Sequence, residues 1–149
     1  MGSLSSVYLH IVFSTKNREP ILTYYIKDEI ISLFHTVSSS HGCIVLACNG
    51  MPDHIHLLVK TNMQKSISDI VKEIKRLSSL KINTKYKDRG FYWQHHFAAF
   101  SVSHSLVPKV INYIKNQESH HLNTPVTYLS ELEDFAKHAN ETIDWDFYE

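Results

Sequence analysis

The chain has 149 residues, of which 43% are hydrophobic, and its 15 lysines and arginines balance its 15 aspartates and glutamates. This length supports one domain with a hydrophobic core and is short for two. No apolar run reaches the roughly 18 residues that a membrane-spanning helix needs. The first residues, MGSLSSVYLHIVFS, lack the charged start and apolar block of a signal peptide. We therefore expect a single cytoplasmic domain over residues 1–149.

The first part of the chain alternates strand and helix patterns. Val7–Phe13 (VYLHIVF) is rich in β-branched and aromatic residues and predicts a strand. In residues 24–37 the apolar side chains recur at helical spacing. Ile44–Cys48 is short and continuously apolar, and NGMPD joins it to the alternating run His54–Val59. These two segments are predicted to form a β-hairpin, because proline and aspartate favour a turn.

The second part continues with a helix, a strand and further helices. Ser66 precedes an apolar stripe at helical spacing, and Asp69 stands where a helix N-terminus favours negative charge. A basic loop, KYKDRG, leads to a strand-like run, FYWQHHFAAFSVS. Pro108 suits the first turn of a third helix, predicted over about 106–121. An acidic tail follows at about 122–149 and includes one more short amphipathic helix.

The predicted order is β-α-β-β-α-β followed by α, which is typical of the ferredoxin-like (RRM-like) split βαβ fold. Such an α+β domain places two helices on one face of a four-stranded antiparallel sheet. If Ile55, Leu57 and Val59 face these helices, the alternation puts His54 and His56 on the other face. We expect that other face to be open.

Charge is unevenly distributed along the chain. Residues 60–89 contain nine basic residues against three acidic ones, whereas the chain from residue 118 onward contains eight acidic residues against a single lysine. A solvated helix face would explain the basic middle, but a phosphate-binding surface fits the asymmetry better. The candidate phosphate-binding residues are Lys72, Lys75, Arg76, Lys81, Lys85, Lys87, Arg89 and, on the third helix, Lys109.

His54 and His56 lie two positions apart on one predicted strand, so both imidazoles project from the same face. A lone buried histidine is usually structural, but such a pair is half of a metal site or a surface for an anion. Imidazole suits zinc, copper, iron and nickel, and also manganese at lower affinity. Two histidines do not complete a metal site, so a third ligand is expected elsewhere in the chain.

The third predicted helix offers candidates for the rest of the site. Tyr113 and Gln117 are four residues apart and lie on one side of this helix, next to its apolar stripe. A tyrosine in this position is most often an amphipathic surface residue. Beside a metal-bound phosphate, its hydroxyl could instead attack phosphorus while the glutamine oxygen completes the metal shell. His10 is expected to be an ordinary strand residue. His95 and His96 are either extra phosphate contacts or simply strand residues, and the second interpretation is preferred.

Four short segments together resemble a known family. MPDHIHLLVK resembles the His-hydrophobic-His signature of the HUH endonucleases, and YIKNQ resembles the tyrosine helix of their single-tyrosine branch, the IS200/IS605 transposases. HIVFSTKNREPIL is similar to the first strand and loop of that group, and FYWQHHFAAFSVS to its last strand. The order and spacing of these segments cover nearly the whole chain. The family often has a glycine-aromatic pair where this chain has His95 and His96.

The resemblance implies a transposase that cleaves and rejoins single-stranded DNA at element ends and recognises DNA hairpins there. Tyr113 would attack a phosphodiester, leaving a 5′-phosphotyrosine link and a free 3′-hydroxyl. His54, His56 and Gln117 would hold Mg²⁺ or Mn²⁺. We expect Mn²⁺ to be at least as effective, because Mg²⁺ prefers oxygen ligands. The resemblance also implies a homodimer in which the tyrosine helix docks on the histidine pair of the other subunit.

Three other functions stay open from the sequence. The sheet of a split βαβ domain can bind single-stranded nucleic acid without catalysis, as RNA-recognition domains do, although their aromatic pattern is absent here. A domesticated relative would nick or bind repeated hairpins without moving an element. A metal-dependent hydrolase would use a metal-bound water in place of Tyr113.

Overall fold

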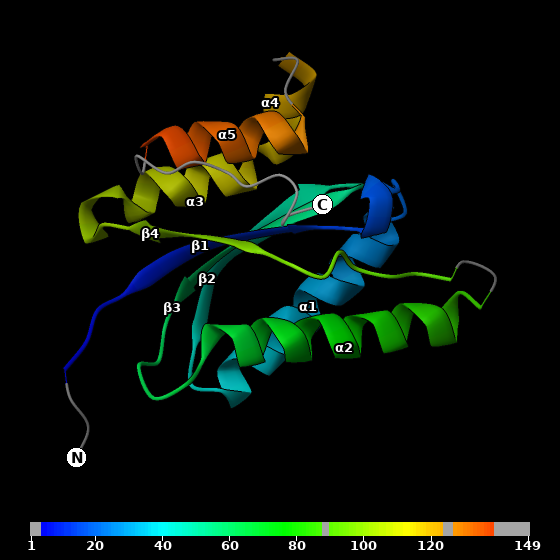
Figure 1. Ribbon diagram of the computed structural model, residues 1–149, viewed down its shortest axis with the longest axis horizontal. Helices are drawn as coiled ribbons and strands as arrows, with labels where there is room; N and C mark the ends of the chain where they lie inside the picture. Colours follow the sequence, from blue (N-terminus) through cyan, green and yellow to red (C-terminus); the bar gives the residue numbers. More distant parts are fainter. Residues whose placement is uncertain (1–3, 88–89, 124–126, 139–149) are drawn as a thin grey trace.

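The computed structural model describes residues 4–87, 90–123 and 127–138 (Figure 1). Its centre is a four-stranded antiparallel sheet with the strand order β2-β3-β1-β4. The strands are β1 (Tyr8–Ser14), β2 (Ile44–Met51), β3 (His54–Lys60) and β4 (Ala98–Val102). The α-helices are α1 (Tyr24–Ser40), α2 (Ile67–Lys85), α3 (Val107–Lys115), α4 (Gln117–Asn123) and α5 (Tyr128–His138), and two short 3-10 turns, η1 (Lys16–Arg18) and η2 (His104–Leu106), follow β1 and β4. This arrangement confirms the predicted ferredoxin-like α+β fold.

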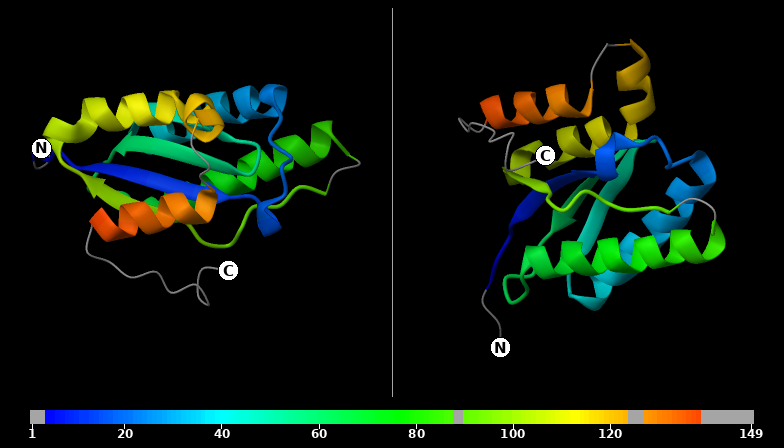
Figure 2. Two further views of the ribbon diagram at one scale, coloured as in Figure 1. Left: turned by 90° about the horizontal axis from the view of Figure 1, so that it is seen from above. Right: turned by 45° about the vertical axis from the view of Figure 1, so that its right-hand side comes forward.

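Helices cover both faces of the sheet, and Figure 2 shows the two layers from further sides. On one face α1 and α2 enclose the main hydrophobic cluster, to which β3 contributes Ile55, Leu57 and Val59 as predicted. The other face carries α3, α4 and α5. None of the helices in the described ranges is long and apolar enough to cross a membrane.

The prediction of an open sheet face was wrong. Val107 and Ile114 of α3 cluster with Leu58 of β3, and Tyr128 of α5 packs with Val12 of β1. Both helices have an apolar stripe that must be buried, and the uncovered side of the sheet offers the apolar surface they need. The two strand histidines are therefore enclosed between the sheet and a second helical layer.

The β2–β3 hairpin turns at Pro52 and Asp53, in agreement with the sequence, and Met51 pairs with His54 across the turn. A Cβ atom at Gly50 would lie 2.1 Å from the backbone oxygen of His54, so only glycine fits this close approach. The turn fixes His54 as the first residue of β3.

The strand predicted over FYWQHHFAAFSVS is shorter than expected. Only β4 is regular, and residues 92–97 form an irregular segment that bridges to the sheet through Thr15 and Trp93. A side chain of α2 instead hydrogen-bonds backbone carbonyl oxygens that a longer strand would pair with its neighbour. Lys75 Nζ donates to the carbonyl oxygens of Gln94 and His96, both at 2.7 Å.

The predicted third helix is interrupted. Asn116, with φ −99° and ψ 23°, ends α3, and Gln117 begins α4. Asparagine competes with the helix backbone for hydrogen bonds, which favours such a break. The short amphipathic helix expected in the tail is α5, whereas residues 139–149 of that tail lie outside the described residues.

Candidate active site

The two histidines of β3 meet a carboxylate from the opposite layer. His54 and His56 have ring centroids 5.1 Å apart and are 1% and 0% exposed. The Nε2 atom of His54 lies 3.0 Å from Oε1 of Glu131 on α5, and that of His56 lies 3.2 Å from Oε2. One ligand atom from each of the three residues lies within 4.8 Å of the others, a grouping that could hold a metal ion.

Glu131 also joins the tyrosine helix and α4 to this cluster. Its Oε2 accepts hydrogen bonds from the Tyr113 hydroxyl and, at 3.3 Å, from Gln117 Nε2. His121 Nε2 lies 2.7 Å from the other carboxylate oxygen. The structure thus brings the predicted tyrosine, glutamine and histidine pair together in one chain, around a carboxylate that the sequence did not indicate.

The second ring nitrogen of each histidine, Nδ1, also has a hydrogen-bond partner. Asp53 Oδ1 accepts a hydrogen bond from His54 Nδ1 at 2.7 Å, and His10 Nε2 lies 2.8 Å from His56 Nδ1. Partners of this kind orient a metal-binding ring and leave its other nitrogen free for the ligand role. The prediction that His10 is an ordinary strand residue was therefore wrong.

Burial and hydrogen bonds set the charges of the cluster. Burial lowers the pKa of His56 to about 4 and that of His10 to about 3, so both rings are neutral at pH 7. Burial opposes a charge on His54 too, but hydrogen bonds to Asp53 and Glu131 raise its pKa to about 9. Burial likewise disfavours a charge on Glu131, yet its hydrogen bonds hold the pKa well below the usual range, so the carboxylate is ionised.

Tyr113 is protonated at rest. Burial and the hydrogen bond to Glu131 raise the pKa of its hydroxyl above the ordinary value. Its ring centroid lies 5.7 Å from that of His56. The phenolic proton is therefore directed at the same carboxylate that contacts the histidine pair.

Two buried atoms of the described cluster are suited to bind a cation. His56 Nε2 and Gln117 Oε1 are buried without a hydrogen-bond partner, although the Glu131 carboxylate is close to the first. Buried polar atoms are rarely left in this state, and both carry a lone pair that can bind a divalent ion. Two imidazoles, a carboxylate and an amide oxygen form a donor set that suits Mn²⁺. The same set is less suited to Mg²⁺, because Mg²⁺ prefers oxygen ligands.

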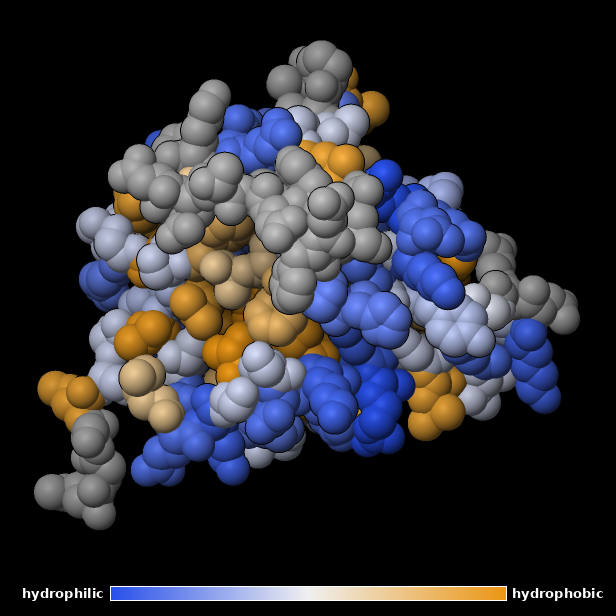
Figure 3. Space-filling view, viewed as in Figure 1, coloured by the Kyte–Doolittle hydropathy of each residue, from blue (hydrophilic) through white to orange (hydrophobic). Residues whose placement is uncertain are grey.

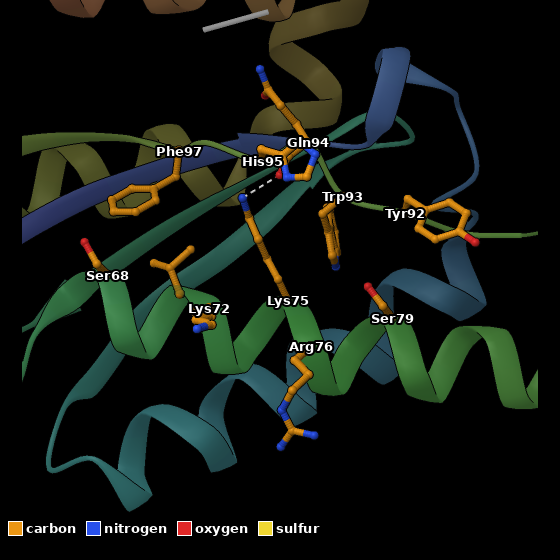
Figure 4. Close-up of a pocket in the computed structure, with 11 residues that line it drawn as sticks. Ser68, Lys72, Lys75, Arg76, Ser79, Tyr92, Trp93, Gln94, His95 and Phe97 are labelled. Carbon is orange, nitrogen blue, oxygen red and sulfur yellow. Dashed lines mark hydrogen bonds between the residues drawn. The ribbon is translucent and has the colours of Figure 1, made fainter. Parts of the chain in front are cut away.

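Most of the predicted phosphate-binding residues lie on α2, on the opposite side of the sheet from the histidine pair. Lys72, Lys75 and Arg76 line a groove of about 520 Å³ between α2 and residues 92–97, which we call the α2 groove (Figure 4). Figure 3 shows hydrophilic side chains gathered over α2 and hydrophobic ones between α2 and β4. This surface is therefore mixed, with cations at its edge.

Several of these cations have partners within the chain. Arg76 pairs with Glu73 at 2.8 Å, Lys85 pairs with Glu29, and Lys75 binds the two backbone carbonyls described above. The candidates with exposed side chains also include Lys72, Lys81, Lys87 and, on α3, Lys109. Arg89 lies outside the described residues.

The chain resembles known transposases in sequence and in fold. The chain is 25% identical over 122 residues to the ISDra2 transposase TnpA of Deinococcus radiodurans, which covers 78% of this chain and 87% of that protein. Two solved structures are similar in fold. One, a transposase from Deinococcus radiodurans R1, has a TM-score of 0.64 at 24% identity and covers 78% of this chain and 95% of that one. The other, a REP-associated tyrosine transposase bound to a REP hairpin, has a TM-score of 0.62 at 15% identity and covers 81% and 72%.

A family model also matches the chain over residues 3–117 and is described as an IS200-like transposase. The matched residues include the histidine pair, Tyr113 and Gln117, whereas His121 and Glu131 lie beyond them. Because the match spans well over half of the sequence, the chain belongs to the family of IS200-like transposases.

Proposed function

We propose that this protein cleaves and rejoins single-stranded DNA at element ends through a 5′-phosphotyrosine link. The observation that supports this proposal is the hydrogen bond from the Tyr113 hydroxyl to Glu131, whose carboxylate also contacts His54 and His56. A nucleophile, a proton acceptor and a set of metal ligands therefore belong to one cluster within one chain.

The chemistry follows from the groups around Tyr113. Its oxygen forms a bond to phosphorus as the bond to the 3′-oxygen breaks, which leaves a 3′-hydroxyl and a 5′-phosphotyrosine. The ionised Glu131 takes the phenolic proton as the bond to phosphorus forms, because it already accepts the hydrogen bond of that hydroxyl. The same proton is then given to the departing 3′-oxygen, so the step leaves a neutral 3′-hydroxyl and an ionised carboxylate. In strand transfer a 3′-hydroxyl attacks the phosphotyrosine, so the bond energy is conserved and no ATP is needed.

His54, His56 and Glu131, with the Gln117 amide oxygen beside them, would hold Mg²⁺ or Mn²⁺. When bound, such an ion polarises a phosphoryl oxygen and stabilises the negative charge that develops on it. The second hydrogen bond of each imidazole, to Asp53 and to His10, fixes the ring orientation.

The proposal extends to DNA hairpins and to the oligomeric state. A cationic α2 groove on the far side of the sheet is suited to a hairpin backbone. The homodimer with a tyrosine helix acting in trans stays a prediction. Within the single chain, the ring centroid of Tyr113 lies 5.7 Å from that of His56.

The covered sheet disfavours the non-catalytic alternative. An RNA-recognition module stacks bases on an open sheet face, and in the described residues α3 and α5 pack on that face. A domesticated relative would use the same chemistry and differs only in whether an element moves.

A covalent-trapping assay tests the proposed function. The protein is incubated with labelled single-stranded hairpin DNAs and Mn²⁺ or Mg²⁺, denatured, and searched for a protein–DNA adduct whose position is mapped by mass spectrometry. We expect an adduct on Tyr113 that requires the ion and disappears in Tyr113→Phe. The control is Tyr25→Phe, which changes an exposed tyrosine of α1. Cleavage without an adduct would instead indicate a metal-dependent hydrolase.

A further inference from the structure

A second groove, of about 350 Å³, opens where β1 ends beside residues 92–97, and we call it the β1-end groove. Its lining includes Ser14, whose Oγ donates a hydrogen bond to Gln94 Oε1 at 2.8 Å. Ser14 is the β1 residue paired with His54. The Tyr128 hydroxyl lies 3.4 Å from the same Gln94 oxygen, and its ring is 5.2 Å from that of His54. The β1-end groove therefore begins next to the histidine pair.

The β1-end groove is basic. Lys16, Arg18, His95 and His96 contribute to its lining, and none of its described lining residues is acidic. Lys16 and Arg18 are exposed on the loop that follows β1. A concave surface with cations and without carboxylates attracts a phosphate group.

An exposed aromatic ring stands at the rim of this groove. Tyr92 is 61% exposed, and Lys16 Nζ lies 5.5 Å from the centroid of its ring. The two residues are also joined through the backbone, since Lys16 N donates to Tyr92 O at 2.9 Å. A ring next to a cation is the combination with which proteins stack a base and contact the backbone of a single strand.

The loop with the two cations is fixed in an uncommon conformation. Asn17 and Arg18 have φ values of 56° and 54°, in the left-handed region that residues other than glycine rarely adopt. Thr15 anchors the loop, because its backbone N–H donates to Asp53 O at 2.9 Å and its hydroxyl donates to Glu19 O at 2.7 Å. A fixed loop loses little entropy when it binds a ligand.

The β1-end groove and the α2 groove lie on the two sides of one segment. Both are lined by Trp93, Gln94 and His95. Figure 4 shows Trp93 directed towards α2 and Gln94 directed away from it. A DNA strand that passes over residues 92–97 therefore leaves one cationic groove and enters the other.

We propose that the β1-end groove binds the nucleotide that flanks the scissile phosphodiester in single-stranded DNA. Lys16 and Arg18 contact its phosphate, and Tyr92 stacks on its base. This inference rests on the proposed function, because it takes the ligand to be the strand that Tyr113 cleaves.

Two DNA probes isolate the contribution of this groove. One is a hairpin with short single-stranded tails of random sequence on both ends, and the other is the same hairpin without tails. Binding is measured by fluorescence anisotropy in EDTA, so that cleavage plays no part. Lys16→Gln combined with Arg18→Gln is expected to weaken binding of the tailed hairpin about tenfold and to leave the other probe unchanged. An equal loss for both probes, or no loss for the tailed one, would overturn the inference.

Further variants separate charge from stacking. Tyr92→Ala is expected to weaken only the tailed probe without changing its salt dependence, whereas the double variant reduces the salt slope by about 0.7 for each phosphate that the protein no longer neutralises. The matched control is Lys60→Gln with Lys65→Gln, because Lys60 pairs with Tyr8 at the opposite end of the sheet from His54. This control removes the same charge and should not discriminate between the probes.

The result is independent of the cleavage assay. Tail-dependent binding that disappears in the double variant supports the groove even if no Tyr113 adduct forms, and that missing adduct would overturn only the proposed function. Conversely, suppose that a Tyr113 adduct forms while the double variant binds the tailed hairpin as tightly as the wild type. That result would overturn only the inference about the β1-end groove. Because Lys16 and Arg18 are exposed, the thermal unfolding midpoint should stay at the wild-type value and serves as the folding check.

Discussion

Glu131 connects parts of the chain that are far apart in sequence. It contacts His54, 77 positions earlier, and Tyr113, 18 positions earlier. Strand alternation sufficed to predict that His54 and His56 share a face, and helical spacing sufficed for Tyr113 and Gln117. Neither the strand period nor the helical period predicts that α5 contacts β3, because that contact depends on where α5 docks on the sheet. Only the histidines that follow the tyrosine, in NQESHH, were a local hint of more polar groups at the site.

The role of Glu131 can be tested by removing its charge alone. Glu131→Gln is expected to lower Mn²⁺ affinity by at least about tenfold, because a carboxylate ligand becomes a neutral amide. Isothermal titration calorimetry measures this change directly. Glu133→Gln, an exposed neighbour on α5, is the matched control and should bind Mn²⁺ like the wild type. Equal affinity in both variants would show that the carboxylate does not hold the ion.

The histidine pair makes a second prediction at this scale. His54→Ala and His56→Ala are expected to abolish cleavage of single-stranded DNA, because each removes a ligand of the proposed ion. Circular dichroism should show that both variants remain folded. His35→Ala, which changes an exposed histidine of α1, controls for the loss of an imidazole elsewhere. A wild-type cleavage rate in either site variant would contradict the metal role.

At the scale of elements, the break between α3 and α4 falls directly before Gln117, a residue of the site. Gln117 is 0% exposed, begins α4, and donates a hydrogen bond from its amide to Glu131. The apolar stripe of α3 was predictable from its period. The break was not, because asparagine is compatible with a helix interior and with a helix end. The same limit applies to residues 92–97, whose β-rich composition does not reveal that Lys75 occupies their backbone acceptors.

Lys75 is expected to act on stability more than on DNA binding. Lys75→Met removes hydrogen bonds to the carbonyl oxygens of Gln94 and His96 and should reduce the free energy of unfolding by about 1–3 kcal/mol. Lys72→Met, on the exposed side of α2, should change it by less than about 0.5 kcal/mol and lower DNA affinity instead. Urea unfolding compares the two variants. Identical unfolding curves would mean that the Lys75 hydrogen bonds contribute nothing to the fold.

At the scale of the whole molecule, the sheet is enclosed by two helical layers. The order of elements predicted the split βαβ topology and the layer formed by α1 and α2. It did not predict the layer formed by α3 and α5, because an apolar stripe shows that a helix must pack but not on which surface. The family match ends at residue 117, so α5 and its site carboxylate lie outside the matched residues.

Cations distributed over one side of the molecule predict a steep salt dependence for hairpin binding. If the α2 side neutralises about four phosphates, raising the salt concentration from about 50 to 200 mM should weaken binding about a hundredfold. Anisotropy titrations at several salt concentrations measure the slope. Lys72→Gln should reduce that slope by about one unit. A flat response would exclude α2 as the DNA surface.

The positions of α2 and the histidine pair on opposite sides of the sheet set a minimum length for the substrate. A strand that leaves a hairpin held on α2 must pass a helix and the sheet, about 10 to 15 Å, before it reaches Tyr113. At roughly 3.4 Å per stacked nucleotide, this path corresponds to about three or four unpaired nucleotides. The thickness of the protein, independently of any base contact, thus sets the spacing between a hairpin and its cleavage site.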